Sequence, residues 1–182
     1  MTKKVILIKP LTDESVMRRA CDMTRKPGMV PSKMTKEKIY KCEHSPARTI
    51  TFWIELQGIP SFVSTHLVRH KIGVEHYVES NRDDRGGAGD NEVTRNTPVN
   101  HGLFVNAVAL IQMARKRLCY ASHTKTVGVF RRLRKEMEEV DPALANAMVP
   151  DCVSKGYCPE VRECRPGLHK VLAAYENSQP IK

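Results

Sequence analysis

Apolar and polar residues alternate in two places near the start of the chain, and each pattern predicts a strand. The aliphatic run VILI stands just before Pro10 and predicts a short buried strand over Lys3–Lys9. A longer alternation over Arg48–Leu56 gives a polar and an apolar face, and the apolar face comprises Ile50, Phe52, Ile54 and Leu56. Gly58 is expected to end this second strand.

Helical spacing dominates the rest of the chain. Thr12 is the expected N-cap of a first helix, and Pro60 is the expected first residue of a second helix that reaches His70. Asp141 is the expected N-cap of a short helix that ends before Pro150. The apolar positions of the first helix and of two longer helices are Val16, Ala20 and Met23; Ala107, Leu110, Ala114 and Leu118; and Val127, Phe130, Leu133, Met137 and Val140.

Two stretches lack a clear period. Arg25–Lys41 contains prolines, a glycine and several lysines, which predicts a loop or an irregular helix, and the glycine-rich stretch Asp83–Glu92 predicts a mobile loop. Strands at the front and helices behind predict an α+β fold, an antiparallel sheet with flanking helices. We expect one domain over residues 1–182, with a cysteine-rich tail over residues 151–182.

The charge of the chain points to an anionic partner. The 182 residues include 30 Lys and Arg against 20 Asp and Glu, a formal net charge of +10. Nucleic acid, phosphates and solvated helix faces all fit this excess, but aromatic residues make up only 5% and argue against a stacking platform for single strands. The chain has no apolar stretch long enough for a membrane span, and its apolar start is too short for a signal peptide, so a cytoplasmic location is expected.

The densest polar cluster follows the predicted second helix. His66, Arg69, His70 and Lys71 come first, and Ser80 to Arg82 follow. Guanidinium, ammonium and imidazole groups at the end of one helix suit bound phosphates. A charged, solvated helix end gives the same pattern.

Six cysteines are present, and three of them fall at equal spacing in the tail, Cys152-x5-Cys158-x5-Cys164. Together with Cys119 they can form a four-thiolate structural zinc site. The spacing is wider than in zinc knuckles, so buried free cysteines are a second interpretation. A redox pair is a third, although no Cys-x-x-Cys occurs.

The order of the motifs resembles the flavin-dependent thymidylate synthases. Arg69-His70-Lys71 is similar to the Arg-His-Arg of that family's signature, and Ser80-Asn81-Arg82 is similar to its Ser-x-Arg. Upstream, His44-Ser45-Pro46 resembles the His-x-Ser/Thr-Pro element. Downstream, the stretch from Leu144 to Pro150 resembles the Ala-Arg-x-x-Leu-Pro segment.

The resemblance implies a homotetramer whose active sites form between subunits and bind FAD together with dUMP. It implies a one-carbon unit from methylenetetrahydrofolate, hydride from NADPH through the flavin, and no cysteine nucleophile. It assigns the flavin to His44, Ser45, Arg69, His70 and Lys71. It assigns the pyrimidine deoxynucleotide to His66, Ser80, Arg82 and Asn146.

Three positions depart from the family pattern. Lys71 stands in place of the third motif arginine, His66 in place of a glutamine, and Asn146 in place of a nucleotide-binding arginine. The tail after Pro150 is also short and cysteine-rich. Modification of dCMP and hydroxymethylation of dUMP therefore remain open beside dUMP methylation, as does a basic nucleic-acid-binding or nucleotide-sensing protein that kept the fold.

Overall fold

A four-stranded antiparallel sheet forms the centre of the protein. The computed structural model describes residues 5–30, 33–87 and 93–176. The strands are β1 (Ile6–Pro10), β2 (Thr51–Pro60), β3 (Val74–Val78) and β4 (Pro98–Asn106), in the spatial order β1-β2-β4-β3. Helices flank this sheet, so the predicted α+β fold is confirmed.

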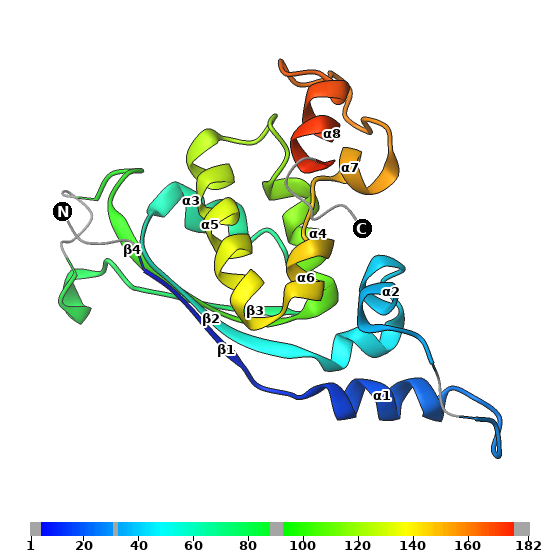
Figure 1. Cartoon of the computed structure of the whole chain (residues 1–182). Helices are drawn as coiled ribbons and strands as arrows, with labels where there is room; N and C mark the ends of the chain where they lie inside the picture. The colour runs from blue at the N-terminus through cyan, green and yellow to red at the C-terminus, as the bar shows by residue number, and fades with distance from the viewer. Residues whose placement is uncertain (1–4, 31–32, 88–92, 177–182) are drawn as a thin grey trace.

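Helices cover one face of the sheet, as Figure 1 shows. They are α3 (Ser61–Leu67), α4 (Ala107–Arg117) and α5 (Thr124–Val140). Three residues of the predicted apolar face lie in β2 and are buried opposite residues of β4: Phe52 opposite Val105, Ile54 opposite Leu103 and Leu56 opposite His101. The fourth, Ile50, is buried but precedes the strand. Strand pairing therefore aligns the two apolar rows under the helices.

The first strand differs from its prediction. β1 is an edge strand that pairs with β2 alone, and Leu7 on its outer face is half exposed. Ile6 and Ile8 pack against the core from the other face. An aliphatic run of four residues does not reveal whether both faces are covered. Lys3 and Lys4 lie outside the described residues.

The junction between β2 and α3 also differs. Gly58 does not end the strand, because a bulge between Leu56 and Ile59 carries β2 on to Pro60. Gly58 has a φ of 65°, which a glycine adopts without strain. Pro60 is the N-cap of α3 and not its first residue, and α3 ends at Leu67. His70 therefore lies beyond the helix.

The N-terminal helix α1 (Glu14–Met23) is capped by Asp13 and not by Thr12. The Thr12 hydroxyl donates to the Thr49 carbonyl instead, at 2.7 Å. The buried face of α1 carries Met17 and Cys21, whereas the predicted apolar positions Val16 and Met23 are 44% and 69% exposed.

A short helix, α2 (Lys36–Lys41), stands in the stretch predicted to be a loop or irregular helix. Its residues Ile39 and Tyr40 are fully buried. The Tyr40 hydroxyl donates to Asp141 at 2.9 Å, and Asp141 also caps α6 (Pro142–Ala147), as the sequence predicts. This one carboxylate joins segments about a hundred residues apart.

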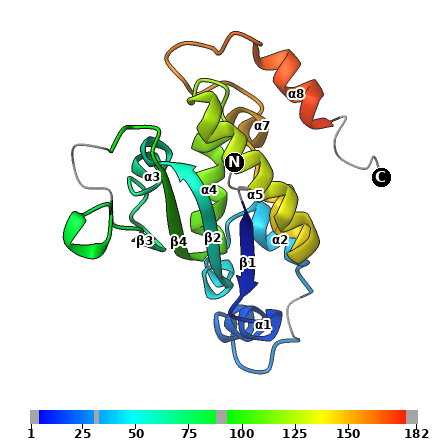
Figure 2. The same ribbon diagram turned by 90° about the vertical axis from the view of Figure 1, so that its left-hand side faces the viewer.

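The rest of the chain forms short elements. Two 3₁₀ turns are η1 (Ser45–Thr49) and η2 (Asp83–Arg85), and the second lies in the predicted mobile loop, whose residues 88–92 are outside the described ones. The tail forms α7 (Asp151–Lys155) and α8 (Leu168–Glu176), and α8 extends away from the sheet in Figure 2. None of the described helices has the length and apolar character needed to cross a bilayer.

Candidate functional site

Basic side chains from three segments meet beside the α3–β3 connection. We call His66, Arg69, His70, Arg117 and His123 the cationic cluster. Nε of Arg117, at the end of α4, donates to Nε2 of His70 at 3.0 Å. Nδ1 of His66 lies 2.9 Å from Thr126 Oγ1 on α5. The fold therefore adds residues of α4 and α5 to the motif found in the sequence.

The electrostatics of this cluster favour an anion. Burial, together with the Arg117 charge, lowers the pKa of His70 to about 4. Burial and the charges of Arg117 and Arg69 also lower the pKa of His66, and burial beside Arg69 lowers that of Arg117. The ion pairs formed among the described residues all involve other cations. A phosphate can therefore meet guanidinium groups that no carboxylate neutralises.

A chain of hydrogen bonds holds the backbone of this segment. Nε2 of His76 lies 2.7 Å from the His70 carbonyl, which only accepts, so this nitrogen carries the proton. Nδ1 of His76 lies 2.9 Å from His101 Nε2, and His101 Nδ1 lies 2.9 Å from the Ser64 hydroxyl. Ser64 and His101 are both buried. The network ties β3, β4 and α3 to the His70 carbonyl.

Gly73 completes the turn into β3. Its φ is 73°, and a Cβ there would lie 2.3 Å from the side chain of Asn106. Asn106 is itself the N-cap of α4. The turn is therefore packed against the start of the helix whose other end carries Arg117.

We expect this histidine network to make the protein less stable in acid. Burial lowers the pKa of His101 to about 4, and His76 adds to the effect. A histidine whose pKa is depressed on folding stabilises the protein fully above its unfolded pKa of 6.5. That stability is lost as the pH falls from 6.5 to about 4. For His101 alone, the free energy of unfolding is expected to fall by about 3 kcal/mol over this pH range.

Urea unfolding at several pH values measures this effect. The His101→Gln variant should lose less stability between pH 7 and pH 4.5 than the wild type. His169→Gln is the matched control, because His169 is exposed in the tail. Equal pH profiles for the wild type and His101→Gln would contradict the interpretation.

Other predicted residues of the site lie away from the cluster. Lys71 is exposed beyond His70. Ser80 and Arg82 follow β3, where Arg82 is paired with Asp84. Among the described residues, neither Ser80 nor Arg82 forms a hydrogen bond or an ion pair with the cationic cluster.

His44 and Ser45 lie at the start of η1, next to a different basic cavity. This open cavity of about 600 Å³ is lined by His44 together with Arg25, Lys33 and Lys38. Nδ1 of His44 is buried and has no hydrogen-bond partner in the described structure. Unsatisfied buried nitrogens of this kind are uncommon in folded proteins, and a ligand atom is one way to satisfy them.

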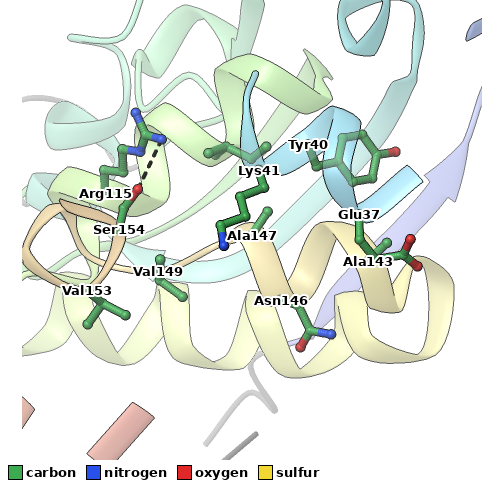
Figure 3. A pocket seen from close by; sticks show the side chains of 11 residues that line it. Glu37, Tyr40, Lys41, Arg115, Ala143, Asn146, Ala147, Val149, Val153 and Ser154 are labelled. Carbon is green, nitrogen blue, oxygen red and sulfur yellow. Dashed lines mark hydrogen bonds between the residues drawn. The ribbon is translucent and has the colours of Figure 1, made fainter. Parts of the chain in front are cut away.

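Asn146 lines a cavity of about 420 Å³ between α2, α4, α6 and α7, which we call the Asn146 cavity (Figure 3). Lys41 and Arg115 provide its positive charges. Arg115 is paired with Glu43 and donates to Ser154 Oγ at 3.3 Å, but its buried Nε has no partner in the described structure. The volume is within the range of small-ligand sites.

Helix α4 separates the cationic cluster from the Asn146 cavity. Arg115 and Arg117 are two residues apart, so they leave the helix on opposite sides. In the sequence alone, this basic end of α4 fits a solvated helix face. No local signal distinguishes a solvated arginine from one that meets a distant motif.

Cys119 and the three tail cysteines lie around one small cavity. Cys119, Cys152, Cys158 and Cys164 line one cavity of about 10 Å³. Across residues 5–30, 33–87 and 93–176, no set of three or more His, Cys, Asp and Glu side chains is arranged to hold a metal ion. The zinc site therefore stays a prediction.

Comparisons with known proteins give a fold but no family. No family model matches the sequence, and no curated protein matches it. Among solved structures, the chain is similar to the UMP/dUMP methylase PolB from Streptomyces cacaoi, whose crystal structure was determined bound with 5-Br dUMP. The TM-score is 0.58 at 12% identity, over 80% of this chain and 95% of that one. At this identity the likeness shows a shared fold alone.

Proposed function

We propose that this protein is a flavin-dependent enzyme that transfers a one-carbon unit to C5 of a pyrimidine deoxynucleotide. The most direct reaction is dUMP to dTMP with methylenetetrahydrofolate and NADPH. The observation that carries the proposal is the cationic cluster, in which Arg69 and Arg117 have no carboxylate partner among the described residues. The resemblance to the flavin-dependent family and the shared fold with a UMP/dUMP methylase support it.

The residues of the cluster fit the phosphates of FAD. Arg69 and Arg117 supply forked donors, and neutral His66 and His70 supply hydrogen bonds without adding charge repulsion. His44, with its unsatisfied Nδ1, and Ser45 are the proposed second group of flavin contacts. FAD, when bound, would take up hydride from NADPH and pass it on to the one-carbon unit, and the protein supplies position and electrostatics.

We assign the nucleotide to the Asn146 cavity. The Asn146 amide can pair with a pyrimidine edge, and Lys41 and Arg115 can reach a phosphate. Ser80 and Arg82 lie beyond β3 and form no hydrogen bond or ion pair with the cationic cluster among the described residues. In the proposed homotetramer, the Ser80–Arg82 segment of one subunit completes a site on another.

The electron balance distinguishes the possible products. A methylene group enters at the oxidation level of formaldehyde, so forming a methyl group consumes one hydride, and NADPH becomes NADP⁺ while the folate leaves as tetrahydrofolate. Hydroxymethylation instead takes up water and consumes no reductant. Asn146 stands where a nucleotide-binding arginine is expected and changes the polar groups around the nucleotide, so dCMP is the alternative substrate.

Visible absorbance of the purified protein tests the proposal. We expect FAD bands that persist through gel filtration and that shift on addition of dUMP. A shift with dCMP alone would assign the alternative substrate, and NADPH consumption would identify methylation. A colourless protein that does not bind FAD would contradict the proposal.

A nucleic-acid-binding role is the second candidate, because the net charge is +10. It predicts that binding to DNA or RNA weakens steeply as the salt concentration rises. A nucleotide sensor, in contrast, would bind FAD or a nucleotide and show no turnover.

A further inference from the structure

The C-terminal tail has little hydrophobic core of its own. α7 has five residues and α8 has nine. Among the described tail residues, 151–176, Asp151 and Val171 are buried, whereas Tyr157 and Val161 are exposed. Such a small amount of buried apolar surface rarely orders a segment without a covalent or metal constraint.

Four cysteines meet where this tail joins the domain. Cys119 lies just after α4, Cys152 lies in α7, and Cys158 and Cys164 lie in the loop between α7 and α8. All four line the same cavity, whose volume of about 10 Å³ has room for a single atom-sized species. The other two cysteines, Cys21 and Cys42, lie in or beside α1 and α2.

Charged side chains also lie at this cavity, because Asp151 and Glu160 line it together with the cysteines. Lys116 adds a positive charge beside the cavity, where it pairs with Asp151 and Glu160.

We propose that Cys119, Cys152, Cys158 and Cys164 bind one structural zinc ion that fastens the tail to the end of α4. Four thiolates complete the tetrahedral shell of zinc and leave no open position, so the site is structural and not catalytic. In the described conformation the four thiols are not yet grouped at binding distance. Zinc binding therefore requires the sulfur atoms to move closer together, and each cysteine side chain can turn about its Cα–Cβ bond.

Metal analysis of the purified full-length protein tests this site. We expect about one zinc per chain in the wild type and in Cys42→Ser, the matched control with an exposed thiol. Cys158→Ser and Cys164→Ser should each lose most of the zinc. Addition of a strong chelator should make the tail of the wild type more sensitive to limited proteolysis.

Cobalt substitution gives a second readout that needs no variant. Co²⁺ in a four-thiolate site shows strong visible d–d bands and sulfur-to-metal charge transfer, and added zinc should displace both. Wild-type protein free of metal, with no cobalt spectrum, would overturn the proposal. Zinc retained in full by both tail variants would also overturn it, and iron in place of zinc would reassign the metal. None of these outcomes depends on FAD or nucleotide binding.

Discussion

Replacing Arg69 by alanine is expected to abolish the retention of FAD through gel filtration. Arg69 is exposed beside Arg117 and has no carboxylate partner in the described chain, so its charge is available to a phosphate. A charged hydrogen bond contributes about 1.5–3 kcal/mol. Its loss should therefore weaken FAD binding about 10- to 100-fold, which fluorescence titration measures. The melting temperature should remain the same, because an exposed side chain is removed.

Two controls separate a specific contact from a general loss of charge. Arg19→Ala also removes one positive charge, from an exposed position on α1, and should keep the FAD affinity of the wild type. Arg69→Lys keeps the charge but loses the forked donor, so its affinity should lie between those of the wild type and Arg69→Ala. Full flavin retention by Arg69→Ala would remove the cationic cluster from the proposed site.

The largest effect on stability is expected from Asp141→Ala. Asp141 is buried, accepts from the Tyr40 hydroxyl at 2.9 Å, caps Leu144 of α6 at 3.1 Å and pairs with Lys36 at 2.9 Å. The substitution leaves a buried hydroxyl without an acceptor and a helix without its cap. Together these losses should lower the free energy of unfolding by about 3–5 kcal/mol. The melting temperature should fall by about 10 °C.

Calorimetry or urea unfolding measures the change, with two comparisons. Glu138→Ala removes an exposed carboxylate that pairs with Arg134, and it should change stability by less than about 0.5 kcal/mol. Tyr40→Phe removes the donor itself, so adding Asp141→Ala to it should cost less than Asp141→Ala alone. A loss of stability for Asp141→Ala no larger than that for Glu138→Ala would contradict this role.

Several features of the fold follow from local sequence. The alternation in β2 and the helical spacing in α4 and α5 identify buried faces, because each period is a property of one element. The Asp-Pro start of α6 follows from local capping.

The strands β3 and β4 were not predicted. Their core-facing positions include His76 and His101, which interrupt the apolar alternation and satisfy each other only after the strands pair.

In the candidate site, too, some features follow from the sequence and others depend on the tertiary structure. The sequence by itself determined the positive charge, the ordered motif around Arg69 and the cysteine spacing, since all three are readable along the chain. Tertiary structure decided which of these groups meet. It joined Arg117 to His70, paired Arg82 with Asp84, and put Asn146 in a separate cavity. The physical reason is that packing and strand pairing between distant segments set these distances, and neither depends on the local period of a sequence.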